Sequence, residues 1–349
     1  MTISVDQLVA DAHAAGASDL HLVCGLPPKF RVDGALRDGY DWSLTHDDCE
    51  DIAFQLAGEA AEAIRTCGEL DLARTFGGVR VRINIFRSQG HAHAALRLLA
   101  DTIPPLSVLG LPSAVMGFPK LNRGIVLVTG ETGSGKSTTL AALINEINQT
   151  RAENIITMED PIEYVHKPAL SIVSQREIGQ DSASYNDALR AVLREDPDII
   201  LLGEMRDLDT ISTALTAAET GHLVFATLHT KSAAESIDRI VDVFPEGLQK
   251  QTRMQLSTTL VAVLSQQLLP RRDSGRALAA ELMMVTPAIR NLIREGKTPQ
   301  IQTALATSAA EGSVTMDNAL INLVRQRAVD AETAIGAAID GDYVRRNAY

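Results

Sequence analysis

Gly130 to Ser137 read G-E-T-G-S-G-K-S and match the phosphate-loop pattern G-x-x-x-x-G-K-[ST]. An apolar run over residues 125–128 precedes the loop, and a helical pattern with apolar residues at 140, 143, 144 and 147 follows it. Glycines let backbone N–H groups turn toward phosphate oxygens, and the positive end of the following helix points at the same anion. A glycine-rich turn that matched by chance would not need this strand and helix, so the stretch predicts a nucleoside triphosphate site.

The loop pattern also predicts roles for single residues. Lys136 is expected to reach the β- and γ-phosphates, and the Ser137 hydroxyl to ligate Mg²⁺. The expected nucleotide-binding residues are Gly130, Glu131, Thr132, Gly133, Ser134, Gly135, Lys136, Ser137 and Thr138.

The composition of the 349 residues is that of an ordinary globular protein, with 45% hydrophobic and 22% charged residues. A formal charge of −12 argues against general nucleic-acid binding, which needs a basic surface, although a local basic groove stays open. No apolar run is long enough to span a membrane, and no signal peptide is recognised, so we expect a cytoplasmic protein that could dock on a membrane complex. Cys24, Cys49 and Cys67 are expected to be reduced, buried and without zinc.

The first hundred residues have the pattern of a small α+β domain. A helix is expected over residues 5–15 and another over 47–64, and Asp33-Gly34 suits the type I′ turn of a hairpin. Residues 79–86 alternate strictly, which predicts a strand with one apolar face and with Arg80 and Arg82 on the other. Further strands are expected over residues 19–23 and 94–99.

Four prolines between residues 101 and 122 predict a linker, after which a second, α/β domain is expected over 123–349. Strands alternate with helices there, as in a nucleotide-binding sheet. The expected strands are 125–129, 155–158, 170–174, 199–202 and 222–228. From about residue 270 the pattern predicts mostly helix.

Two groups of acidic residues follow expected strands of this sheet. Glu159, Asp160 and Glu163 come after the first strand, and Glu204 comes after the run 199–202. Ligands of open α/β sheets bind at the carboxyl ends of strands, so Glu204 and Glu163 are expected to act in hydrolysis. Isolated carboxylates after strands are usually solvated, and Glu159 and Asp160 fit a role in turns and caps about as well.

Histidines and arginines add weaker predictions. His222 and His229 flank an apolar strand, and the spacing leaves structural and functional roles equally open. Arg80 and Arg82 fit either a solvated sheet face or arginine fingers that reach phosphate in trans. Arg190 and Arg194, on an expected helix over 184–195, fit a subunit contact or plain exposure.

A short amphipathic helix is sharply bounded near the end of the second domain. Thr286 is expected to cap it, Pro287 suits its first turn and Gly296 ends it. The pattern predicts an apolar stripe of Ile289, Leu292 and Ile293 that packs on a neighbour.

Taken together, these motifs resemble the type IV pilus retraction, or twitching-motility, ATPases (PilT-like) of the secretion/traffic ATPase superfamily. The resemblance rests on the phosphate loop and on T-M-E-D-P-I-E-Y, L-R-E-D-P-D-I-I-L-L-G-E-M-R-D, T-G-H-L-V-F-A-T-L-H-T and A-I-R-N-L-I-R-E. It runs in order along nearly the whole chain, including A-S-D-L-H-L near the start. The stretch from Arg97 to Pro105 departs from the usual pattern of the family.

The resemblance implies a homohexameric ring that binds ATP and Mg²⁺, built from a PAS-like N-terminal α+β domain and a RecA-like domain with a helical C-terminal part. Lys136, Glu163 as general base and Glu204 as Walker B carboxylate would be catalytic, with Ser137 and Glu204 at the metal. His222 and His229 would form the His box, and Arg82 and Arg97, with Arg80, the arginine fingers. The retraction motif would be Ala288, Ile289, Arg290, Asn291, Leu292, Ile293, Arg294 and Glu295.

The expected function is therefore a motor that hydrolyses ATP to retract type IV pilus fibres. The implied location is the cytoplasmic face of the inner membrane, where a pilus platform protein would be the partner and no nucleic acid is expected. The main alternative is a pilus-assembly or type II/type IV secretion ATPase, although this chain lacks the extra N-terminal domain and tetracysteine insert of many such proteins. A nucleic-acid translocase and a regulatory scaffold without turnover are further alternatives.

Overall fold

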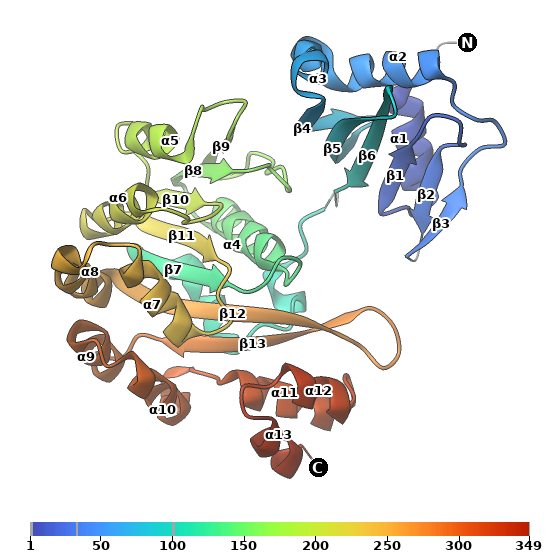
Figure 1. Cartoon of the computed structure of the whole chain (residues 1–349). Coiled ribbons are helices and arrows are strands. Elements are labelled where there is room, and N and C mark those ends of the chain that lie inside the picture. Colours follow the sequence, from blue (N-terminus) through green and yellow to red (C-terminus); the bar gives the residue numbers. More distant parts are fainter. Residues whose placement is uncertain (1–2, 33, 100–101, 349) are drawn as a thin grey trace. The chain divides into compact units, whose positions relative to one another are not determined.

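The computed structural model describes residues 3–32, 34–99 and 102–348. The chain divides into two compact units, which are described separately below (Figure 1). The first unit comprises Met1–Thr102 together with Pro161–Val165, and the second comprises Ile103–Asp160 and His166–Tyr349. The expected fold class is confirmed: an N-terminal α+β unit precedes a RecA-like α/β unit.

The first unit contains a six-stranded antiparallel sheet in the order β3-β2-β1-β6-β5-β4. Its strands are β1 (Asp19–Leu22), β2 (Lys29–Val32), β3 (Ala35–Asp38), β4 (Glu69–Phe76), β5 (Val79–Ser88) and β6 (His91–Leu98). The predicted alternation of β5 is present, because Val79, Val81, Ile83 and Ile85 are buried. Val32 pairs with Ala35 as a hairpin requires, but Asp33 of the expected turn lies outside the described residues.

Helices cover the apolar face of this sheet. They are α1 (Val5–Ala14), α2 (His46–Ala57) and α3 (Ala61–Cys67), with the 3-10 turn η1 (Gly58–Ala60) between the last two. Thr45 begins α2 with a capping box, in which its hydroxyl accepts from the Asp48 N–H and the Asp48 carboxylate accepts from the Thr45 N–H. The helices and strands share one apolar core.

The second unit contains a seven-stranded sheet in the order β13-β12-β7-β11-β10-β8-β9. Its strands are β7 (Gly124–Thr129), β8 (Asn154–Glu159), β9 (Ile172–Glu177), β10 (Ile199–Leu202), β11 (Leu223–Leu228), β12 (Leu260–Pro270) and β13 (Arg276–Met284). The strands from β12 to β9 are parallel, and β13 is antiparallel to β12. Every residue of β7, β10 and β11 is buried, as in strands covered on both faces.

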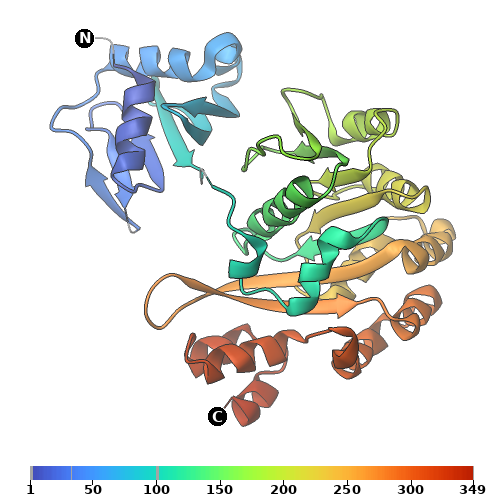
Figure 2. The same cartoon turned by 180° about the vertical axis from the view of Figure 1, so that it is seen from behind.

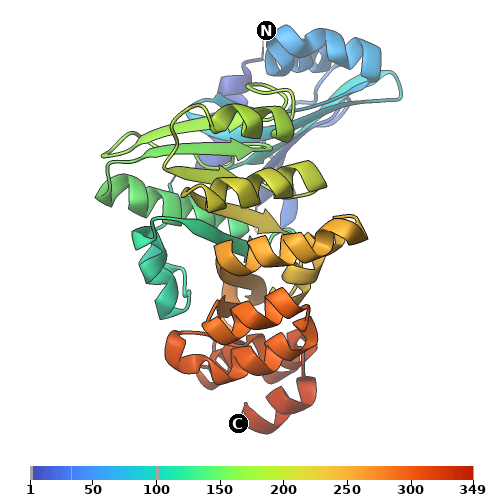
Figure 3. The same cartoon turned by 90° about the vertical axis from the view of Figure 1, so that its left-hand side faces the viewer.

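Helices cover both faces of this sheet. One face packs against α4 (Lys136–Thr150) and the 3-10 helices η2 (Leu106–Val108) and η3 (Ser113–Lys120) (Figure 2). The other face carries a row of α5, α6, α8 and α9, which lie side by side in Figure 3. The helices on this second face are α5 (Tyr185–Val192), α6 (Leu208–Glu219), α7 (Ala233–Asp242), α8 (Glu246–Thr259), α9 (Pro287–Glu295) and α10 (Ile301–Thr307).

The end of the chain corrects one prediction. The region from about residue 270 was expected to be mostly helical, but β13 lies within it and forms a long hairpin with β12 (Figure 1). Three short helices then pack on the far end of that hairpin: α11 (Met316–Arg325), α12 (Ala331–Ala337) and α13 (Gly341–Asn347). The turns η4 (Thr298–Gln300) and η5 (Ala309–Glu311) connect α9, α10 and α11.

Most of the proline-rich stretch 101–122 is packed structure. Leu106, Val115 and Phe118 are buried in the same core as α4. Prolines exclude a long α-helix here, but they suit the starts of short 3-10 turns, and the apolar residues between them supply the contacts. The segment from Ile103 onward therefore belongs to the second unit. Asp101 lies outside the described residues.

The cysteines are free, as expected, but they are not all buried. Cys49 is buried, Cys24 is half-buried and Cys67 is exposed. Cys67 is the last residue of α3, where a helix end faces solvent, so the expectation of burial was wrong for it. Among the described residues, no helix combines the length and the apolar composition needed to cross a bilayer.

Candidate nucleotide site

The phosphate loop joins the carboxyl end of β7 to the start of α4. Three of its glycines have positive φ, +140° at Gly130, +81° at Gly133 and +92° at Gly135, which are values that L side chains rarely adopt. Lys136 is the first residue of α4, and its Nζ donates to the carbonyl oxygens of Gly130 at 2.7 Å and Glu131 at 3.0 Å. The lysine therefore reaches back across the loop, toward the space in which a phosphate loop holds its anion.

Strand β12 supports the loop from below. A Cβ on Gly130 would collide with the carbonyl oxygen of Gln266, so only glycine fits beside this strand. The Gln266 side chain donates from Nε2 to the Thr139 hydroxyl at 2.9 Å, and Thr129 donates to Ser265 at 2.8 Å. These buried hydrogen bonds tie both ends of the loop to β12.

Glu204 lies at the same edge of the sheet, two residues after β10. Its carboxylate accepts from Arg206 at 2.7 Å and lies 3.4 Å from Nε2 of His229, the residue that follows β11. The Glu204 side chain is 18% exposed, whereas those of Arg206 and His229 are 64% and 46% exposed. A mostly buried carboxylate with a cation and an imidazole beside it is a group that can bind a metal or move a proton.

Tyr185 and Glu159 pack beside this cluster. The Tyr185 hydroxyl lies over Gly203, where a Cβ would come within 2.7 Å of it. Burial, followed by the negative charge of Asp160, raises the pKa of Tyr185 above its ordinary value, so its hydroxyl stays protonated. Glu159 accepts from the Thr157 hydroxyl at 2.7 Å and from Gln175 at 3.1 Å, which fixes this carboxylate between β8 and β9. Asp160 is exposed.

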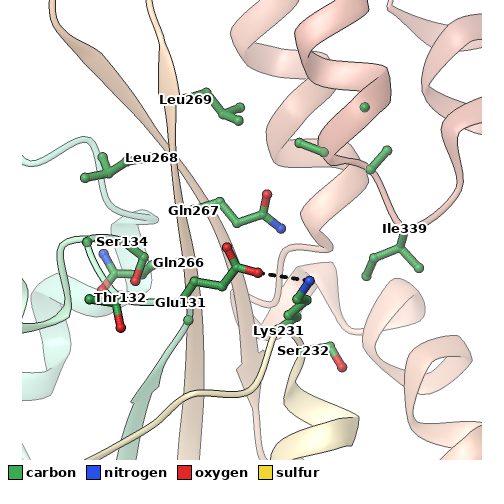
Figure 4. A pocket seen from close by; sticks show the side chains of 15 residues that line it. Glu131, Thr132, Ser134, Lys231, Ser232, Gln266, Gln267, Leu268, Leu269 and Ile339 are labelled. Atoms are coloured by element: carbon green, nitrogen blue, oxygen red, sulfur yellow. Dashed lines mark ion pairs between the residues drawn. The ribbon is translucent and has the colours of Figure 1, made fainter.

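Lys231 connects the loop to the segment after β11. Its Nζ lies 2.9 Å from the Glu131 carboxylate, and both side chains are 69% exposed (Figure 4). An ion pair this exposed contributes little to stability, about 0–1 kcal/mol. It does place a second lysine beside the loop.

Glu163 and the candidate arginine fingers belong to the first unit. Glu163 lies in Pro161–Val165, which groups with that unit. Arg82 on β5 pairs in register with Arg97 on β6, and Arg97 pairs with Asp19 on β1. Nε of Arg97 lies 3.0 Å from the Asp19 carboxylate, although its side chain is 69% exposed. Arg80 is half-buried on the same face of β5.

The two histidines of the expected His box lie at opposite ends of β11. His229 reaches Glu204, whereas His222 lies before the strand, where its Nδ1 is 2.8 Å from the Ala217 carbonyl and 3.1 Å from the Thr220 hydroxyl. His222 therefore closes the last turn of α6.

The short helix α9 has the bounds that its capping residues predicted. The Thr286 hydroxyl accepts from the Ile289 N–H, and Gly296 ends the helix at φ +68°. Ile289 and Ile293 are buried, Leu292 is half-buried, and Arg294 and Glu295 are exposed. Arg290 was expected to point outward, but its guanidinium donates to the last carbonyls of α8, at 2.6 Å to Ser257 and 3.0 Å to Thr258.

Sequence reasoning missed several residues at this site: Arg206, Tyr185, Lys231, Gln266 and Thr139. Arg206 and Lys231 each lie two residues from a residue that was predicted, Glu204 and His229, so they could have been found by following the motifs further. Gln266 and Thr139 carry no such signal because their contact depends on β12, which the sequence did not reveal.

A parallel sheet with a phosphate loop after one strand, and with a carboxylate after another, defines a P-loop nucleotide-binding protein. The model of the Type II/IV secretion system protein family matches residues 1–335, and the chain belongs to this family.

Individual relatives narrow the similarity. The "Type IV pilus retractation ATPase PilT" of Pseudomonas aeruginosa is 45% identical over 334 residues, which cover 95% of this chain and 97% of that protein. The "Twitching motility protein" of Neisseria gonorrhoeae is 52% identical over 256 residues, or 73% of this chain and 68% of that one. A crystal structure of the pilus retraction motor PilT with bound ADP superposes with a TM-score of 0.93 at 46% identity and covers 99% of both chains.

Proposed function

We propose that this protein is a motor that hydrolyses ATP and uses the energy to retract type IV pilus fibres. The similarity to pilus retraction ATPases extends over nearly the whole chain, and the phosphate loop, Glu204 and α9 stand where such a motor needs them. The observation that carries the proposal is the Glu204 cluster beside the phosphate loop, because a loop that only binds nucleotide needs no such carboxylate.

The residues divide the chemistry between them. Lys136 holds the β- and γ-phosphates once they displace its two bonds to loop carbonyls. Ser137 and Glu204 offer hard oxygen ligands, which fit Mg²⁺, and the metal would neutralise charge on the phosphates. His229, next to Glu204, lies where it can respond to the γ-phosphate. Glu163 is the proposed general base, and Arg80, Arg82 and Arg97 are the proposed arginine fingers.

The assembly that this mechanism needs is a homohexamer. The first unit serves as the PAS-like N-terminal domain and the second as the RecA-like motor domain. The ring works at the cytoplasmic face of the inner membrane, bound to a pilus platform protein. Ala288–Glu295 serves as the retraction motif, and ATP drives the cycle because it contacts the protein differently from ADP.

Deletion of the gene in its host tests this function. We expect surface pili to be present but unable to retract, and we expect the wild-type gene, but not Lys136→Ala, to restore retraction. Loss of pili altogether would favour a role in assembly and contradict the proposal.

Phosphate release by the purified protein tests the chemistry. Glu204→Ala is expected to abolish ATP hydrolysis, because it removes the carboxylate at the carboxyl edge of the sheet. Glu246→Gln, at the exposed start of α8, serves as the control and is expected to turn over normally. Turnover at the wild-type rate by Glu204→Ala would refute the catalytic assignment.

A further inference from the structure

A cavity of about 620 Å³ opens beside the outer wall of the phosphate loop, within the second unit. Gly130–Ser134 form one wall, Gln266–Leu269 of β12 form the second, and Gly336–Ile339, between α12 and α13, form the third (Figure 4). The volume lies in the range of small-ligand sites, about 300–1,000 Å³. A ligand that holds its phosphates in the loop would extend its remaining part into a space of this kind.

The walls of the cavity are mostly small and apolar. Leu268, Leu269 and Ile339 supply aliphatic surface, and Gly336 to Ala338 leave room between them. Ile339 is 54% exposed, an unusual fraction for a large aliphatic side chain fixed beside a binding loop. A flat, weakly polar group in the cavity would cover this surface.

Gln267 is the polar group of the β12 wall. Its side chain extends toward the middle of the cavity in Figure 4, between the Glu131–Lys231 pair and Ile339. Within the described residues its amide makes no hydrogen bond, although the residue is half-buried. The amide offers one acceptor and two donor hydrogens. The Ser134 hydroxyl, on the loop wall, is also buried without a partner in this part of the chain.

We propose that this cavity holds the adenine base of the bound nucleotide and that the Gln267 amide reads the edge of that base. A glutamine amide matches adenine, which presents a donor at N6 next to an acceptor. Guanine is best recognised by a carboxylate that accepts from its two neighbouring N–H groups, and the one carboxylate in the cavity wall, Glu131, is paired with Lys231. The assignment rests on the proposed ATPase function and adds the source of its preference for ATP.

Two buried carboxylates hold the walls of the cavity in place. Glu281 on β13 accepts from the N–H of Ala233 at 2.9 Å, just after Ser232 of the cavity wall, and from that of Met316 at 3.4 Å. Asp317, the next residue, accepts from the N–H groups of Ile339 at 2.8 Å and Asp340 at 3.1 Å. Glu281 and Asp317 are therefore positioning residues for two walls of the base site.

Equilibrium binding measured by calorimetry on the full-length protein tests the proposal. The probes are the non-hydrolysable analogues of ATP and GTP, with Mg²⁺, and tripolyphosphate, which has no base. Wild-type protein is expected to bind the ATP analogue more tightly than the GTP analogue. Gln267→Ala is expected to weaken binding of the ATP analogue about ten-fold, to reduce the preference over GTP, and to leave tripolyphosphate binding unchanged.

A second variant probes the apolar wall without risk to the fold. Ile339→Ala removes a side chain that is already half in solvent, and is expected to weaken binding of the ATP analogue about three-fold without change for tripolyphosphate. Gln251→Ala, on the exposed side of α8, and Ile172→Ala, on the edge strand β9, are the matched controls and are expected to bind all three probes normally.

The results separate this proposal from the proposed function. Unchanged affinity of Gln267→Ala for the ATP analogue, or an equal loss for tripolyphosphate, would overturn the base assignment even in a protein that hydrolyses ATP. Conversely, a protein that shows the expected pattern of binding but never releases phosphate would refute the motor and leave the base site intact.

Discussion

The phosphate loop and the helix α9 are both short segments that the sequence marks clearly, yet their side chains are used in opposite ways. At the loop, Lys136 is held only by carbonyl oxygens of the loop itself, and the Ser134 hydroxyl is buried without a partner in the described chain. In α9, Thr286, Arg290 and Gly296 are all engaged in closing helix ends. The loop keeps hydrogen-bonding capacity for a ligand, whereas α9 spends most of its capacity on the fold.

This contrast predicts that loop variants lose activity and keep stability. Lys136→Ala is expected to lower ATP turnover about a thousand-fold or more, because it removes a charge that stabilises the transferring phosphoryl group. Its melting temperature is expected to stay within about 2 °C of wild type, since the lost bonds are replaceable by water. Phosphate release and thermal unfolding measure the two effects, with Lys120→Ala at an exposed position of η3 as the control. A large loss of stability would mean that the loop depends on its lysine to fold.

His166 tests whether an unpartnered polar atom always marks a ligand site. It is 9% exposed, its Nδ1 has no hydrogen bond in the described part of the chain, and burial lowers its pKa to about 4. Between the unfolded value near 6.5 and about 4, the unfolded chain binds a proton that the folded chain does not. Stability is therefore expected to fall by about 3 kcal/mol as the pH falls through this window.

Denaturant unfolding at pH 7 and pH 4.5 measures this effect. In His166→Phe most of the difference between the two pH values is expected to disappear, while the exposed His13→Gln keeps it. An unchanged pH dependence in His166→Phe would show that carboxylates elsewhere account for the loss.

Within α9 the contrast predicts a loss of stability without loss of turnover. Arg290→Ala is expected to destabilise the protein by about 1.5–2 kcal/mol, because the last carbonyls of α8 lose a charged donor. Arg294→Ala, four residues on and exposed, is expected to stay within about 0.5 kcal/mol of wild type. Urea unfolding distinguishes the two. Equal effects would show that the position of Arg290 against α8 carries no weight.

The smallest expected effect is at the start of the same helix. Thr286→Ala removes the acceptor for the Ile289 N–H and is expected to lower stability by about 1 kcal/mol. Thr303→Ala, on the exposed side of α10, is the control for loss of a threonine alone. A difference of less than about 0.3 kcal/mol between the two would mean that water replaces the cap.

Local signals allowed much of this fold to be predicted. The bounds of α9 follow from three residues, and the alternation of β5 and the buried runs of β7 and β10 are visible in the sequence. The long hairpin of β12 and β13 was missed because Leu260–Pro270 mixes glutamines with apolar residues and continues from α8 without a turn signal.

The site was predictable to a similar extent. The loop and the neighbourhood of Glu204 with His229 follow from motifs at strand ends. The contacts of Gln266 and the position of Gln267 in a cavity wall depend on β12, so no motif could reveal them. The inward turn of Arg290 was missed for a related reason, because helical periodicity does not report that α8 ends within its reach.

The collision between a Cβ on Gly130 and the Gln266 carbonyl gives the first letter of the phosphate-loop motif a second meaning. That glycine would be required even if no nucleotide ever bound, because the neighbouring strand already fills the space. A protein engineer who moved the eight-residue loop to another sheet would therefore have to bring a matching strand with it. The motif records the architecture around the loop as well as the ligand inside it.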